Sequence, residues 1–136
     1  GYTRPGPRDY VGRAPLSQRE SKALAEYTRQ VDPQLVLAYH TQGKSIYWQF
    51  RDCHVPGAQT LAREFARVSG YRMEDTPYES SFAGYKDWFI QTFRRPGFTI
   101  EAGTGTNPLP LSQFDTIYRD NLGILTTAAL GLPGGA

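Results

Sequence analysis

Two residues that could take part in the same hydrolytic reaction stand at the ends of short β-rich runs. His40 ends an apolar run over 35–40, and Glu101 follows Phe98–Ile100 and precedes a glycine-containing loop. Open α/β sheets bind their ligands beyond the carboxyl ends of strands. A metal-activated water needs a histidine ligand and a nearby carboxylate base. The pair could supply that chemistry, although such a histidine can also be purely structural and such a carboxylate merely solvated or ion-paired.

The sequence does not supply a complete metal site around this pair. A catalytic zinc site needs three protein ligands, whereas the chain has two histidines. His54 lies in a loop beside Cys53, and we expect it at the surface rather than at a metal. The single cysteine excludes an internal disulfide and a cysteine-based metal cage, and no His-Glu-x-x-His motif occurs. From the residues alone, we predict half of a site.

The length, composition and charge of the chain favour a globular domain and argue against some other classes of protein. At 136 residues, with 39% hydrophobic and 21% charged residues, the chain is large enough for one domain with a real core. No apolar run is long enough to span a bilayer. The fifteen basic residues are scattered and the net charge is only +2, which argues against nucleic-acid binding.

Hydrophobic periodicity predicts an α/β fold with a sheet covered by helices. The expected elements, in order, are a helix from the capping box at 17–20 to residue 31, strands at 35–40 and 45–49, helices at 58–70 and 85–93, a strand at 98–100 and a helix from Ser112 to about 131. We expect the first two strands to be neighbours joined through Gly43, residues 1–15 to form a loop and residues 131–136 a tail.

Two of these helices carry apolar stripes that we expect to face the core. In the first helix the stripe consists of Ala23, Leu24, Tyr27 and Val31. In the last helix it consists of Phe114, Ile117, Tyr118, Leu122 and Leu125.

Three ordered stretches with matched spacing resemble the zinc carboxypeptidases (the M14-type or funnelin family). L-A-Y-H-T-Q-G-K-S-I-Y-W resembles the strand that ends in the last histidine ligand, and G-F-T-I-E-A-G resembles the strand with the catalytic glutamate. K-D-W at 86–88 resembles the start of the helix that precedes the glutamate strand. The resemblance covers essentially the whole chain. T-P-Y-x-S-x-x-A-G-Y-K-D-W and G-T-G-T-N-P-L-P look most like the bacterial γ-D-glutamyl-L-diamino-acid endopeptidases.

The resemblance implies roles for four residues. His40 would be a zinc ligand, and Glu101 the general base toward a zinc-activated water. Tyr78 lies near the position of the family's mobile tyrosine, which closes over substrate; the alternative is an ordinary loop aromatic after Pro77. Lys86 falls where family members set side-chain specificity and would favour an acidic substrate group; the alternative is a solvated helix lysine.

The departures from the family pattern imply that residues 1–136 are the C-terminal half of a catalytic domain. The family's His-x-x-Glu ligand pair, its asparagine–arginine pair and its oxyanion-stabilising arginine are absent here. We therefore expect weak or no zinc binding and no activity from this chain alone, and an exposed apolar cut surface that could form a homo-oligomer.

The implied function is zinc-dependent hydrolysis of peptide bonds, with the γ-D-glutamyl-diaminopimelate bonds of peptidoglycan stem peptides as the expected substrate. The alternative is a non-catalytic binding or scaffold module derived from the same fold. A serine hydrolase is a distant third reading, because no G-x-S-x-G elbow occurs. The resemblance implies a bacterial protein and leaves open whether it is cytoplasmic or cell-wall associated.

Overall fold

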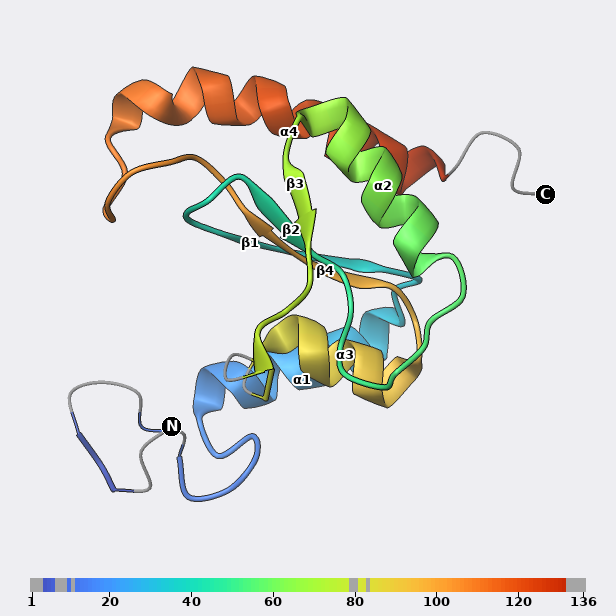
Figure 1. Cartoon of the computed structure of the whole chain (residues 1–136). Helices are drawn as coiled ribbons and strands as arrows, with labels where there is room; N and C mark the ends of the chain where they lie inside the picture. Colours follow the sequence, from blue (N-terminus) through green and yellow to red (C-terminus); the bar gives the residue numbers. More distant parts are fainter. Residues whose placement is uncertain (1–3, 7–9, 11, 79–80, 83, 132–136) are drawn as a thin grey trace. The chain divides into compact units, whose positions relative to one another are not determined.

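The computed structural model describes residues 4–6, 10, 12–78, 81, 82 and 84–131. The predicted tail at 132–136 and parts of the predicted loop at 1–15 lie outside the described residues. The chain forms two compact units, Gly1–Gln34 and Leu35–Ala136. The first contains the helix α1, and the second contains a four-stranded sheet with the remaining helices (Figure 1).

Helix α1 (Arg19–Val31) was predicted, but its start and its buried face differ from the prediction. The residue before the helix is Gln18, and it makes no side-chain capping bond, so the predicted capping box is not formed. The buried residues are Ala25 and Thr28, whereas all four residues of the predicted stripe are exposed: Ala23, Leu24, Tyr27 and Val31. Thr28 can be buried because its hydroxyl donates to the Leu24 carbonyl at 2.7 Å.

The sheet of the second unit has the strand order β1-β4-β2-β3. Strands β1 (Val36–His40) and β4 (Gly97–Glu101) are parallel, and β2 (Ser45–Tyr47) runs antiparallel to β4. Strand β3 (Arg72–Glu74) pairs in parallel with β2 at the edge of the sheet. The fold is therefore α/β with a mixed sheet, as predicted.

The sheet differs from the prediction in two ways. The strands before and after Gly43 are not neighbours, because β4 lies between them. Phe98 and Ile100 of β4 are fully buried, so this strand takes the central position with a partner on each side. Strand β3 was not predicted from the sequence. Its three residues alternate charged, apolar and charged, and only Met73 packs against the core.

Helices cover both faces of the sheet (Figure 1). Helices α2 (Ala58–Ser69) and α4 (Phe114–Leu130) lie on one face, and their buried side chains join those of the strands in the main core cluster: Ile46, Ala62, Phe65, Tyr71, Phe98, Ile100, Ala102 and Ile124. Helix α3 (Tyr85–Phe93) covers the other face. It lies so close to β4 that a Cβ on Gly97 would be 3.2 Å from Ile90. Among the described residues, none of the helices has the length and apolar character needed to cross a membrane.

Helix α4 buries a different face from the one predicted. A short 3-10 turn, η2 (Leu111–Gln113), precedes it, and Ser112 does not cap it. The helix turns Asn121 and Ile124 inward and leaves four of the predicted stripe residues exposed: Phe114, Tyr118, Leu122 and Leu125. Gly123 explains this orientation, because a Cβ there would lie 2.9 Å from the Cβ of Val68 on α2. The two helices pack closely only on the face that contains the glycine.

Candidate active site

His40 and Glu101 are register partners at the carboxyl ends of two adjacent parallel strands, β1 and β4. The Ala102 amide donates to the His40 carbonyl at 2.8 Å, which extends the pairing one residue past Glu101. In-register residues of neighbouring strands project from the same face of a sheet. The two side chains therefore emerge together at one edge, as the sequence predicted. The His40 side chain is exposed and that of Glu101 is half-buried.

The face that carries this pair can be identified from side-chain alternation along β4. Phe98 and Ile100 point into the main core beneath α2 and α4. Gly97 faces α3, so Thr99 and Glu101 share the α3 side of the sheet. Helix α3 packs at the Gly97 end of the strand, which leaves the Glu101 end of this face less covered.

The environment of Glu101 favours its neutral form. Burial raises the pKa of its carboxyl above the ordinary value, and the nearby His40 opposes that shift. The pKa of the Tyr47 hydroxyl is also raised, first by burial and then by the negative charges of Glu74 and Glu101. A partly desolvated carboxyl beside an exposed imidazole is the arrangement expected of a general base next to a metal ligand.

The loops that follow the two strands are joined by hydrogen bonds in both directions. The Thr41 hydroxyl donates to Asn107 Oδ1 at 2.8 Å, and Asn107 Nδ2 donates to the Thr41 carbonyl at 3.0 Å. The Gly43 amide also donates to the Gly103 carbonyl at 2.9 Å. This Thr41–Asn107 clamp ties the residue after His40 to the loop after Glu101, and it was not predicted from the sequence.

The loop after Glu101 is held at a second point by Gln113. Its Oε1 accepts from the Thr104 amide at 3.1 Å, and its Nε2 donates to the Thr104 carbonyl at 2.8 Å. Gly103 has φ +74, and a Cβ there would lie 2.5 Å from Leu109 Cδ1. A side chain at this position would therefore both strain the backbone and displace Leu109.

The structure places Tyr78 on the loop before α3, with its side chain 67% exposed. Its ring packs edge-on against Phe82 at 5.3 Å, and the Arg51 guanidinium lies 5.9 Å from the ring centre. These contacts are with neighbouring loop residues rather than with His40 or Glu101.

Lys86 is buried, not the solvated helix lysine considered as its alternative. Its ammonium donates to the Gln49 carbonyl at 2.7 Å, to Thr76 Oγ1 at 3.1 Å and to the carboxylate of Asp87, which is buried as well. Burial lowers the pKa of the ammonium, and the charge of Asp87 opposes this. A lysine has three N–H donors, and all three are used here. A substrate carboxylate could bind Lys86 only by displacing one of these acceptors.

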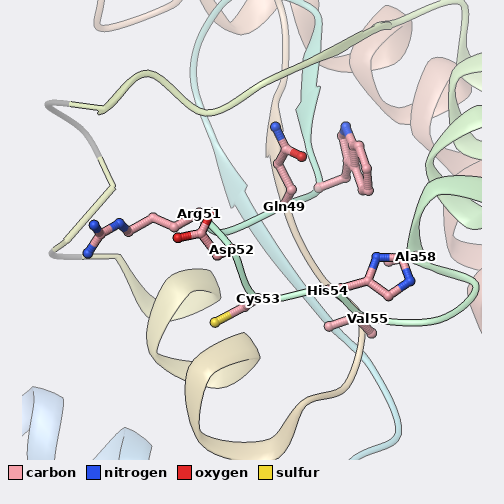
Figure 2. A pocket seen from close by; sticks show the side chains of 8 residues that line it. Gln49, Arg51, Asp52, Cys53, His54, Val55 and Ala58 are labelled. Carbon is pink, nitrogen blue, oxygen red and sulfur yellow. The ribbon is translucent and has the colours of Figure 1, made fainter.

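A small pocket of about 130 Å³ is lined by residues other than His40 and Glu101 (Figure 2). Its lining comes from the segment between β2 and α2 and from the first residue of α2: Trp48, Gln49, Arg51, Asp52, Cys53, His54, Val55 and Ala58. His54 is exposed, as predicted. Within the described part of the chain, no group of three or more histidine, cysteine, aspartate or glutamate side chains is placed to hold a metal ion. His40 can therefore be one ligand of a metal, but the described residues do not complete its coordination.

Known proteins match most of this chain, but the matched region is only part of each of those proteins. The chain is 59% identical to gamma-D-glutamyl-L-diamino acid endopeptidase 1 of Lysinibacillus sphaericus over 120 residues. The aligned region covers 88% of this chain and 30% of that protein. It is 38% identical to the uncharacterised protein YqgT of Bacillus subtilis (strain 168) over 126 residues. This aligned region covers 93% of this chain and 34% of that protein. The chain thus spans about a third of the length of these relatives. No family model matches it.

Solved structures show which fold this segment has. Bovine thrombin-activatable fibrinolysis inhibitor, in complex with tick carboxypeptidase inhibitor, matches with a TM-score of 0.74 at 18% identity, over 89% of this chain and 47% of that one. Carboxypeptidase A from Helicoverpa armigera matches with a TM-score of 0.68 at 15% identity, over 89% of this chain and 36% of that one. The resemblance drawn from the motifs, and the fold predicted with it, are confirmed.

Proposed function

We propose that this chain, a segment with the carboxypeptidase fold and a relative of a γ-D-glutamyl-L-diamino acid endopeptidase, supplies part of the active site of a zinc metallopeptidase. The observation that carries the proposal is the pairing of His40 with Glu101 on adjacent strands. The expected substrate is a γ-D-glutamyl-diaminopimelate bond in a peptidoglycan stem peptide, and the name of the Lysinibacillus relative supports that choice.

His40 is the zinc ligand in this proposal. Its imidazole is exposed at a strand end beside a carboxylate, which fits one position of a three-ligand catalytic site. When bound, zinc would polarise the substrate carbonyl and lower the pKa of the attacking water. The remaining ligands have to come from outside the described residues, because these hold no metal-binding group of three.

Glu101 is the general base. Its carboxylate accepts the proton of the attacking water and can return it to the leaving amine. Its half-buried position at the strand end, in register with His40, supports this role. The Thr41–Asn107 clamp fixes the loop after His40 against the loop after Glu101, which keeps the two groups in register.

Tyr78 and Lys86 have secondary roles in the proposal. The exposed ring of Tyr78 sits on a loop from which it could close over a bound peptide. Lys86 favours an acidic group of the substrate, reached by exchange of one of its three acceptors.

The test compares two substitutions in a full-length carboxypeptidase domain that contains this chain. Glu101→Gln keeps the size of the side chain but cannot accept the proton, so hydrolysis of a γ-D-glutamyl-diaminopimelate peptide should fall roughly 10²- to 10⁴-fold while zinc content stays the same. His40→Ala should lose both zinc and activity. Near-normal activity of Glu101→Gln would show that Glu101 is not the base.

The second candidate function is a non-catalytic binding or scaffold module. It is favoured by the incomplete ligand set among the described residues. We expect the isolated chain to bind zinc weakly and to hydrolyse no stem peptide. Tight stoichiometric zinc on the monomeric chain, resistant to a mild chelator, would contradict that expectation. Lack of hydrolysis by the full-length domain would favour the scaffold function.

A further inference from the structure

The sheet face that carries His40 and Glu101 continues across two more strands as a row of polar side chains. Residues in register across β1, β4, β2 and β3 form this row: His40, Glu101, Ser45 and Arg72. The next row on the same face, two residues along each strand, consists of Ala38, Thr99, Tyr47 and Glu74. Because neighbouring strands are about 4.8 Å apart, the Cα of Arg72 lies roughly 10 Å from that of Glu101.

Arg72 and Glu74 form an ion pair on this face. Arg72 Nε donates to Glu74 Oε1 at 2.9 Å, and the Ser45 hydroxyl donates to the same oxygen at 3.0 Å. The hydrogen bond from the Arg72 guanidinium, followed by that from Ser45, lowers the pKa of the Glu74 carboxyl. The carboxylate is therefore charged, fixed in position and separated from the strand of Glu101 by β2 alone.

The pair retains capacity to bind a ligand. Glu74 Oε2 has only a long contact, 3.5 Å from the Tyr47 hydroxyl. The Arg72 side chain is 70% exposed, and its Nη2 makes only long contacts, 3.3 Å to the Gly43 carbonyl and 3.5 Å to Ser45. One acceptor and the outer edge of a guanidinium thus remain available on the sheet face that carries Glu101.

We propose that Arg72 and Glu74 form a specificity subsite for the charged end of the diamino acid in the substrate. Glu74 Oε2 accepts from the second ammonium, and the Arg72 guanidinium binds a carboxylate on the same carbon. The side chain of diaminopimelate carries this ammonium and carboxylate together. This inference rests on the proposed function, since it assumes that the scissile bond lies beside Glu101.

A surface ion pair with no role in substrate binding would show the same short distances. The location of the Arg72–Glu74 pair, on the sheet face of His40 and Glu101, distinguishes a subsite from such a pair. Arg67 and Glu64 on α2 form such a pair, with Nε to Oε2 at 2.9 Å. Helix α2 covers the opposite face of the sheet, away from His40 and Glu101. Arg67→Met and Glu64→Gln are therefore matched controls for Arg72→Met and Glu74→Gln.

The experiment measures kcat/KM of the full-length domain on three peptides, in which D-glutamate is joined through its γ-carboxyl to diaminopimelate, lysine or norleucine. The side chain of diaminopimelate carries an ammonium and a carboxylate, that of lysine carries an ammonium alone, and that of norleucine carries neither group. We expect Glu74→Gln to reduce the preference for lysine over norleucine roughly 10- to 100-fold. Arg72→Met should reduce the preference for diaminopimelate over lysine by a similar factor. The α2 controls should keep the wild-type preferences.

The outcomes separate this proposal from the one on which it rests. If the wild-type domain cleaves none of the peptides, the proposed function fails. If it cleaves them and both variants keep the wild-type preferences, or slow all three peptides equally, the subsite is wrong and the proposed function stands. Should Glu74→Gln fail to fold, Arg72→Met still tests the carboxylate half, because the Arg72 side chain is mostly exposed.

Discussion

Thr41 and Asn107 exchange two hydrogen bonds, at 2.8 and 3.0 Å, between the loops that follow His40 and Glu101. Both residues are exposed, so these bonds contribute little to global stability. Their position gives them a larger expected effect on geometry, because each loop begins directly after a residue of the proposed active site.

We predict that Asn107→Ala lowers kcat of the full-length domain roughly tenfold with little change in KM, because small displacements of catalytic groups are costly. Thr41→Val should have a smaller effect, since the Thr41 carbonyl still accepts from Asn107. The unfolding midpoint in urea should move only slightly. Thr106→Ala, at an exposed neighbouring position, serves as the control. Wild-type kcat in Asn107→Ala would mean that the clamp does not position the site.

We predict that Lys86→Met destabilises this chain by about 3 to 5 kcal/mol, measured by urea denaturation. The change leaves the buried carboxylate of Asp87 without its cation and removes the donor to Gln49 and Thr76. The double change Lys86→Met/Asp87→Leu should recover much of the loss, because a buried pair can often be replaced by apolar residues. Equal stability of Lys86→Met and wild type would show that the ion pair contributes nothing.

We predict a pH-dependent contribution to stability from Glu74. Its folded-state pKa is lowered, chiefly by the hydrogen bond from Arg72, so its contribution is present above the ordinary value of 4.5 and is lost as the pH falls through the lowered value. The difference in unfolding free energy between wild type and Glu74→Gln should therefore be constant near pH 7 and shrink below about pH 4.5. The same comparison made in an Arg72→Met background should give a flatter profile; an unchanged profile would rule out Arg72 as the main cause.

The exposed stripe on α4, formed by Phe114, Tyr118, Leu122 and Leu125, supports the expectation of self-association. We predict that light scattering on this chain detects a dimer or a larger assembly. Replacing Phe114 and Leu122 by serine should shift it toward monomer, whereas Arg119→Ala, at an exposed polar position of the same helix, should not. A monodisperse wild-type monomer would contradict the prediction.

The sequence predicted the His40–Glu101 edge because each residue ends a short apolar strand, and such strands converge at one edge of a sheet. It could not predict which strands become neighbours. No strand was therefore predicted at 72–74, and the proximity of Arg72 and Glu74 to the sheet face of Glu101 was not foreseen. Asn107 was missed for the same reason, because its partner Thr41 comes close only after β1 pairs with β4.

Helical periodicity located the helices but chose the wrong face of α4. The exposed stripe is more apolar than the buried one, which includes Asn121. The Asn121 amide can be buried because its Nδ2 donates to the Tyr71 hydroxyl at 2.9 Å and to the Ile117 carbonyl at 2.8 Å. The close approach of Gly123 to Val68 then fixes the orientation of the helix, and hydrophobicity alone does not report such a contact.

The central position of β4 has a kinetic consequence. Its two neighbours, β1 and β2, precede it by about fifty to sixty residues in the chain, with α2, β3 and α3 in between. During synthesis, β2 can pair with β3 before β4 emerges, but β1 has no strand partner until then, because β1 and β2 have no hydrogen bonds with each other in the finished sheet. Such non-local pairing is slow to form. The strand that brings Glu101 to His40 is thus also the one that closes the sheet, so we expect the site to assemble late and in the same step as the core.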